Sequence, residues 1–194
     1  GRRGFIGFVS LYKPHAGTAA AALSPQERRQ AVDALDFDRL QLEASNFRPI
    51  IEAIFSHKSE LEHCWLLTTK GQQTPGSSPY APLLVAYLRE RKGIRCKFHH
   101  GEAYTISLDD DALIFSKTYD QVQRILKQTE RLKIASQELV ADITGGVRSM
   151  TLGMILACLN GDRDVEFVGT RYDERGEPAG DPFPIIFSFE PLLE

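Results

Sequence analysis

Short apolar runs alternate along the chain with longer segments in which apolar residues recur every three or four positions. The runs are rich in β-branched and aromatic residues and predict strands. The longer segments show the stripe of one buried helix face, as in Phe47, Ile50, Ile51, Ile54 and Phe55. The predicted strands are residues 4–12, 63–69, 94–99, 138–143, 164–170 and 183–189, and the main predicted helices begin near residues 47, 80, 119 and 147.

Strands that alternate with helices of about ten or more residues imply right-handed crossovers and a parallel sheet. We therefore expect an α/β fold with a Rossmann-like, doubly wound, mostly parallel sheet and an antiparallel final strand. The 194 residues fit one domain, residues 1–194, with a sizeable core. Residues 13–46 form a long insertion after the first strand, with one short helix that Ser24 caps. Residues 108–115 predict a loop or a short extra strand.

The composition limits the kinds of ligand that the protein can bind and indicates where in the cell it is found. Hydrophobic residues make up 42% and charged residues 25%, as in an ordinary globular domain. The net charge of −3 excludes the broad basic field that a long nucleic acid needs, so an anionic ligand must be held by local donors. The three cysteines are far apart, which predicts neither a disulfide framework nor a metal site and favours a cytoplasmic location.

The chain contains no apolar stretch long enough to be a membrane span and no signal peptide. It begins with Gly1 in place of Met, and a basic pair, Arg2 and Arg3, precedes the first predicted strand. Such a pair can follow a membrane helix on its cytoplasmic side, so a tether to the inner membrane in a longer protein is one interpretation. An ordinary polar start is the other.

The turn after the fourth main strand, residues 142–150, carries the strongest signal for a ligand. In a doubly wound sheet the carboxyl ends of the first and fourth strands flank the switch point, where ligands of open α/β sheets bind. Gly145 and Gly146 would let peptide N–H groups approach a ligand closely, and the helix that follows would point its positive dipole end at the same place. Thr144 and Arg148 could add a hydroxyl donor and a guanidinium for phosphate.

A purely structural interpretation of this turn has nearly equal weight. In that interpretation Thr144 caps the helix and Met150 belongs to the core. Asp142 stands where a carboxylate is awkward beside a phosphate, so we expect it to anchor the turn by accepting backbone N–H groups.

Two neighbouring segments are candidates for the same site. The end of the first strand supplies Ser10 and Lys13, and the turn after the second strand supplies Thr69, Lys70 and Gly71. Each of these is an ordinary turn residue when taken alone. Two polar turns at adjacent strand ends are nevertheless what a phosphate-binding edge would contain.

The sequence lacks the motifs of several classes of enzyme. The first strand is not followed by G-x-G-x-x-G, and the second ends in Thr-Thr-Lys where a dinucleotide enzyme needs an acid for the ribose. The P-loop string G-x-x-x-x-G-K-[ST] and the hydrolase elbow G-x-S-x-G are also missing from the sequence. We predict no catalytic residue, no metal and no cofactor.

The string DITGG at residues 142–146, followed by Arg148 and Met150, resembles the CRISPR-associated Rossmann fold (CARF) sensor domains. The second predicted strand with its Thr-Thr-Lys-Gly turn matches the same family in order and spacing. The likeness covers about residues 47–170. Family members commonly have Lys where Arg148 stands, and the insertion at residues 13–46 departs from the compact members.

This resemblance implies a sensor in type III CRISPR antiviral immunity. Such domains are homodimers that bind cyclic oligoadenylate, a ring-shaped second messenger, across the two-fold axis and relay activation to an attached effector. We expect cyclic tetra-adenylate as the ligand and a transmembrane helix as the effector; the alternative is a ring nuclease that cleaves the messenger in the same pocket. The expected ligand-binding residues are Ser10, Lys13, Thr69, Lys70, Gly71, Thr144, Gly145, Gly146, Val147, Arg148 and Met150.

Overall fold

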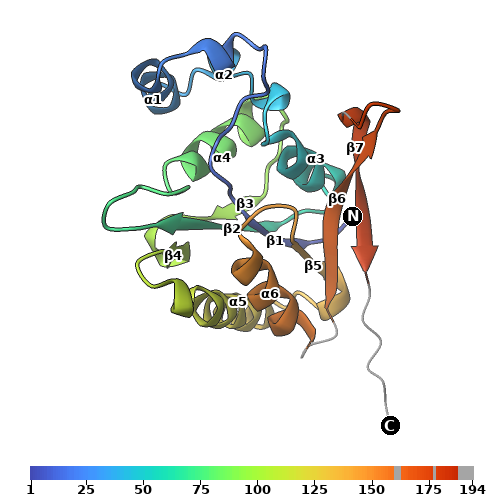
Figure 1. Ribbon diagram of the computed structural model, residues 1–194. Coiled ribbons are helices and arrows are strands. Elements are labelled where there is room, and N and C mark those ends of the chain that lie inside the picture. The colour runs from blue at the N-terminus through green and yellow to red at the C-terminus, as the bar shows by residue number, and fades with distance from the viewer. Residues whose placement is uncertain (160–162, 177, 188–194) are drawn as a thin grey trace.

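The computed structural model describes residues 1–159, 163–176 and 178–187 (Figure 1). Its strands are β1 (Gly4–Phe8), β2 (His63–Lys70), β3 (Lys97–His99), β4 (Thr105–Ser107), β5 (Leu139–Asp142), β6 (Asp164–Tyr172) and β7 (Pro178–Phe187). Its α-helices are α1 (Pro25–Asp33), α2 (Phe37–Leu40), α3 (Arg48–Ser56), α4 (Tyr80–Glu90), α5 (Ile114–Arg131) and α6 (Arg148–Leu159). The expected α/β fold is confirmed.

Within the described residues the strands form one sheet in the order β3-β2-β1-β5-β6-β7, and β4 pairs with the end of β2. All neighbours are parallel except β6 and β7, which are antiparallel. Helices α3 and α4 cover one face of the sheet, and α5 and α6 cover the other (Figure 1). This is the Rossmann-like, doubly wound order, and it places β5 directly beside β1.

Strand β1 lies between β2 and β5, in the middle of the sheet. Because of this position, every one of its five residues is buried. Its side chains alternate between the two faces, as the period of a strand requires. Phe5 joins the core under α3 and α4, while Ile6 and Phe8 join the core under α5 and α6. Trp65 and Leu66 of β2 divide in the same way. The short apolar runs of the sequence are therefore two-sided buried strands.

The insertion at residues 13–46 is part of the core, although its sequence shows little periodicity. It contains α1 and α2 and lies above α4 in Figure 1. Its two ends are joined by a bridge between Pro14 and Ser45 and by the hydrogen bond from the Asn46 N–H to the Lys13 carbonyl, at 3.0 Å. Its buried residues include Val32, Phe37, Leu40 and Leu42, which share the core of α3 and α4.

Several predicted boundaries are wrong. Strand β1 ends at Phe8 and β3 begins only at Lys97, so the predicted ranges 4–12 and 94–99 are both too long. The short extra strand is β4, before the range 108–115, and α5 already begins at Ile114. The final strand starts at Pro178, and its predicted end at residues 188 and 189 lies outside the described residues. Phe55, predicted to be on the buried stripe of α3, is 39% exposed.

Helix α6 packs closely on α5 at a glycine. A β-carbon on Gly153 would lie 2.9 Å from the Phe115 carbonyl oxygen and 3.1 Å from Cβ of Thr118. We predict that Gly153→Val lowers the free energy of unfolding by about 1–3 kcal/mol, because the backbone of α5 must move away. Urea unfolding measures the change.

The control for this prediction is Lys127→Val, which places the same side chain at an exposed position of α5. It should cost no more than about 0.7 kcal/mol, the range of helix propensity. Equal unfolding free energies for Gly153→Val and wild type would contradict the close contact of the two helices.

Candidate anion-binding site

The carboxyl ends of β1 and β5 meet at a pocket of about 310 Å³. The end of β1 contributes Ser10, and the loop after β5 contributes Thr144 and Gly145. The structure thus brings together the two predicted segments that flank the switch point. The other residues that line the pocket are Phe8, Asn46, Phe47, Pro49, Ile50 and Val168.

The loop after β5 is fixed to its surroundings by three hydrogen bonds. The Thr144 N–H donates to Oδ1 of Asp142 at 2.8 Å, which confirms the expected anchoring role of Asp142. The hydroxyl of Thr144 accepts the Val168 N–H from β6 at 2.8 Å, and the Ile143 N–H donates to the Glu166 carbonyl, also at 2.8 Å. These bonds connect the loop to β5 and to β6.

Both glycines of the loop are needed because the end of β1 lies directly against them. A β-carbon on Gly145 would lie 2.9 Å from Oγ of Ser10 and 3.0 Å from the Phe8 carbonyl oxygen. Gly146 has a φ of +85°, which residues other than glycine rarely adopt. A β-carbon added to Gly146 would lie 2.9 Å from the Phe8 ring. The sequence predicted that these glycines let peptide N–H groups approach a ligand closely; the structure shows that the end of β1 also lies close to them.

The peptide N–H groups of residues 145–150 have no hydrogen-bond partner among the described residues. The next N–H along the chain, that of Thr151, is paired and donates to the Val147 carbonyl. Residues Gly146, Val147 and Arg148 are exposed. Since α6 begins at Arg148, its positive dipole end adds to these unpaired donors. A run of oriented, unpaired N–H groups is suited to an anion such as phosphate.

Two residues of this loop each depart from one of the two interpretations. The Met150 side chain is 1% exposed and packs in the core under α5 and α6, as the structural interpretation expected, so this side chain does not contact a ligand. The hydroxyl of Thr144 accepts a backbone N–H from β6 and does not cap α6. A hydroxyl that accepts still has a proton to donate, so Thr144 can also contact a ligand.

The turn after β2 satisfies most of its own polar groups. The hydroxyl of Thr69 accepts the Ser77 N–H at 3.1 Å, and the Thr69 carbonyl accepts the Ser78 N–H at 3.1 Å. The Gly71 N–H donates to the Thr74 carbonyl at 2.9 Å. None of Thr69, Lys70 and Gly71 lines the pocket at Ser10 and Thr144, and neither does Lys13. Lys13 and Lys70 are exposed cations outside its rim.

Asn46 is a pocket residue that sequence reasoning missed. Its side-chain oxygen accepts the Lys13 N–H at 2.8 Å, and its side-chain nitrogen donates to the Leu11 carbonyl at 2.6 Å. Asn46 therefore holds the start of the insertion against its end, at the edge of the pocket. A capping-type residue at the end of an aperiodic segment was the only available signal.

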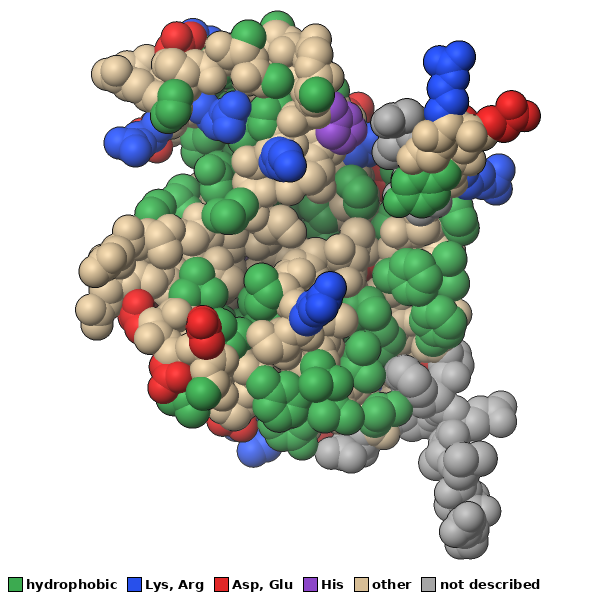
Figure 2. Space-filling model, in the orientation of Figure 1, with side chains coloured by type: hydrophobic (Ala, Val, Ile, Leu, Met, Phe, Trp, Pro, Cys, Tyr) green, Lys and Arg blue, Asp and Glu red, His purple; other side chains and the backbone are tan. Residues whose placement is uncertain are grey.

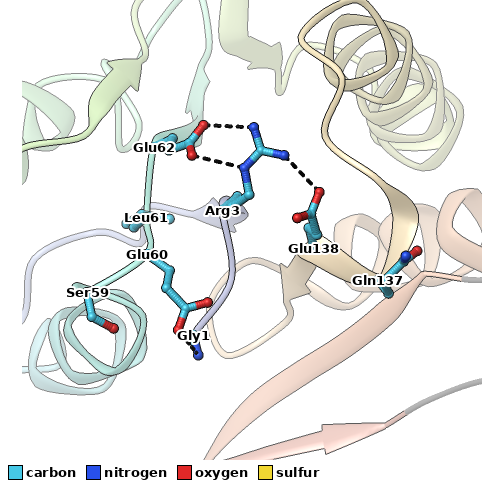
Figure 3. Close-up of a pocket in the computed structure, with 8 residues that line it drawn as sticks. All are labelled: Gly1, Arg3, Ser59, Glu60, Leu61, Glu62, Gln137 and Glu138. Carbon is cyan, nitrogen blue, oxygen red and sulfur yellow. Dashed lines mark hydrogen bonds and ion pairs between the residues drawn. The ribbon is translucent and has the colours of Figure 1, made fainter.

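A larger pocket, of about 410 Å³, lies at the amino ends of β1, β2 and β5, and Figure 3 shows its lining. Arg3 is its main cation, and its guanidinium is already paired with Glu62, at 2.9 Å and 3.0 Å, and with Glu138, at 2.8 Å. The hydrogen bond from Arg3 holds the pKa of Glu62 below its usual value. Glu60 adds a third carboxylate to the lining. This pocket is acidic and does not suit an anion.

Comparison with protein-family models and with curated proteins finds no match for this chain. Among the described residues, no helix combines the length and the hydrophobicity needed to cross a membrane. The same residues contain no group of three or more His, Cys, Asp or Glu side chains arranged to hold a metal ion. The function must therefore be argued from the geometry of the site.

The anchor at Thr144 generates a prediction about stability. In Thr144→Val the Val168 N–H loses its acceptor, and leaving a partly buried donor unpaired costs about 1–3 kcal/mol. We expect the free energy of unfolding to fall by that amount and the Val168 amide to exchange its hydrogen faster. Thr144→Ser keeps the hydroxyl and is the control. Unchanged exchange at Val168 in Thr144→Val would show that this bond does not hold the loop.

Proposed function

We propose that this domain is a CARF sensor, which binds cyclic oligoadenylate in type III CRISPR antiviral signalling and relays its occupancy to an effector. The observation that carries the proposal is the run of unpaired peptide N–H groups at residues 145–150, beside the end of β1. A transmembrane helix as the effector, with the domain at the cytoplasmic face of the inner membrane, remains a prediction; the full-length reading frame tests it.

The chemistry of the site suits a phosphodiester. The protein as a whole has a net charge of −3, so it does not attract anions by its overall field. Fixed N–H dipoles at one loop, with Arg148 exposed beside them, attract an anion only where it docks. The apolar part of the pocket, formed by Phe47, Pro49 and Ile50, suits a base or a ribose next to the phosphate.

The size of the pocket favours a ligand shared by two chains. A pocket of about 310 Å³ is at the lower end of the usual range for small molecules. A ring of four nucleotides would extend beyond it and needs a second surface. A symmetric ring can satisfy this need by contacting the same loop of a second copy across a two-fold axis.

Helix α6 offers an apolar surface for that second copy. Its exposed leucines recur at helical spacing, with Leu152 51% exposed, Leu156 38% and Leu159 42%. Val147 at the loop and Leu113 before α5 extend this surface, which we call the α6 stripe. Figure 2 shows hydrophobic side chains gathered over α6 and the start of α5. Because α6 begins at the loop, a homodimer through this stripe would keep both loops close to the interface.

The polar lining of the pocket is suited to positioning a ligand. Its polar side chains are the hydroxyls of Ser10 and Thr144 and the amide of Asn46. These groups position a ligand, whereas a general acid or base needs a titratable side chain within hydrogen-bond reach. A ring nuclease, acting by positioning of the ribose hydroxyl, remains the alternative. Linear products after incubation with cyclic tetra-adenylate would establish that activity.

Ligand binding is tested by charge reversal in the loop. We predict that Arg148→Glu weakens cyclic tetra-adenylate at least about tenfold in isothermal titration, because one lost charge-assisted hydrogen bond costs about 1.5–3 kcal/mol. Gly146→Val should also weaken binding, since φ of +85° strains any side chain there. Lys127→Glu, on the exposed surface of α5, is the control. Wild-type affinity in Arg148→Glu would exclude this loop as the phosphate site, and cyclic hexa-adenylate tests ring size.

Self-association is tested on the α6 stripe. We predict that Leu156→Glu shifts the protein from dimer to monomer in sedimentation velocity, because a carboxylate would be buried against apolar side chains. Leu132→Glu, at a leucine that is 38% exposed at the end of α5, is the matched control and should leave the dimer unchanged. A Leu156→Glu protein that sediments as wild type would show that the stripe is not the interface.

A further inference from the structure

Three titratable side chains are buried together behind the loop. Glu166 of β6 and Asp142 of β5 are both 0% exposed, and His57, which follows α3, is 4% exposed. Both carboxylate oxygens of Glu166 lie within hydrogen-bond distance of Nε2 of His57, at 3.1 Å and 3.0 Å. Asp142 and Glu166 are register partners on adjacent parallel strands, so their side chains lie on the same face of the sheet.

Asp142 has one satisfied oxygen and one without a partner. Its Oδ1 accepts the Thr144 N–H at 2.8 Å, while Oδ2 is buried and has no hydrogen-bond partner among the described residues. An unpartnered carboxylate oxygen in the interior is costly. A proton on Oδ2 resolves this deficit, because the resulting O–H can donate toward the neighbouring Glu166.

Charge neutrality leads to the same conclusion. Even a protonated His57 supplies a single positive charge against two buried carboxyl groups, so the cluster is neutral only when one carboxyl holds a proton. Glu166 already has His57 as its partner, which leaves Asp142 to hold it. Burial raises the pKa of Asp142 to about 7, and the adjacent Glu166 adds to the rise.

Among the described residues, the buried thiol of Cys64 on β2 also interacts with Asp142. Burial raises the pKa of that thiol well above its usual value, so it stays neutral. Strand β1, between β2 and β5, has no titratable side chain in Gly4–Phe8. Since the pKa of Asp142 is raised to about 7, proton exchange on Asp142 can change the charge behind the loop near neutral pH.

We propose that Asp142 is a positioning residue that must carry a proton when the loop holds an anion, so that ligand binding takes up a proton from solvent. This inference rests on the proposed function for its ligand. Neutral Asp142 still accepts the Thr144 N–H through Oδ1 and keeps the loop in place. Ionised Asp142 puts a negative charge directly behind the N–H groups that attract the phosphate.

The sign of the pH dependence follows from this linkage. The liganded state holds the proton more tightly than the free state, so affinity is highest when Asp142 is already protonated. As the pH rises above neutrality, affinity falls by up to about tenfold per pH unit, the limit for one linked proton. In Asp142→Asn the side chain stays neutral, so cyclic tetra-adenylate should bind at about pH 8.5 roughly tenfold more tightly than to wild type.

The test is a titration of the carboxyl group itself, by carbon-13 NMR of labelled aspartate. Asp142→Asn assigns the resonance, and Asp120→Asn, at an exposed position of α5, is the control that should titrate and bind as wild type. The titration is made on three samples: free protein in sodium chloride, protein with sodium sulfate at the same ionic strength, and protein with cyclic tetra-adenylate. Sulfate serves as a second anion because its charge is constant over this pH range.

We expect the carboxyl to titrate near neutrality in the free protein and at higher pH when either anion is present. A shift with sulfate alone would support the proton linkage and count against cyclic tetra-adenylate as the ligand. Titration of free Asp142 near its ordinary value of about 3.9 would overturn the inference. So would a midpoint that neither anion moves, or an affinity for cyclic tetra-adenylate that is equal at about pH 6 and about pH 8.5.

Discussion

The contact between the end of β1 and the glycine loop after β5 is the constraint on which the rest of the site depends. Phe8 and Ser10 leave no space for a β-carbon on Gly145 or Gly146, so the backbone itself forms the surface there. The positive φ of Gly146 turns the chain into α6 and leaves the N–H groups of residues 145–150 unpaired. Asp142 of β5 accepts the Thr144 N–H, and the Thr144 hydroxyl accepts the Val168 N–H of β6, so the loop is held by both strands. The parallel pairing of β1 with β5 is what brings these parts together.

Much of the fold could be predicted from sequence because its signals are local. Buried strands and amphipathic helices have distinct periods, and right-handed crossovers then fix the strand order. The glycine loop could also be predicted, since a strand, two glycines and a helix are adjacent in the chain. The rest depends on partners that are distant in sequence. The pairing of His57 with Glu166 spans 109 positions, and Asn46 closes the insertion onto residues more than thirty positions earlier. Thr69 was predicted to bind a ligand, but its hydroxyl is bonded to Ser77. That contact forms only when the turn after β2 folds back on the strand, so the sequence does not show it.

The proposed sensor and the buried acid behind it belong to one electrostatic arrangement. The protein has a net charge of −3, so a phosphate ligand of the proposed sensor would have to be attracted locally, by dipoles and the exposed Arg148. A carboxyl group next to those dipoles is tolerable for anion binding only when it is neutral. The burial that anchors the loop also raises the pKa of Asp142 toward neutrality. Loop position and site charge thus depend on the same side chain.

The central claim is that the unpaired N–H groups of residues 145–150 bind the phosphate of a cyclic oligoadenylate. Amide hydrogen exchange of these residues, measured by NMR with and without cyclic tetra-adenylate, tests it most directly. We predict that the ligand slows exchange in this segment, because the N–H groups that contact the phosphate gain an acceptor. Binding of the ligand with unchanged exchange at residues 145–150 would contradict the claim and would place the phosphate elsewhere on the protein.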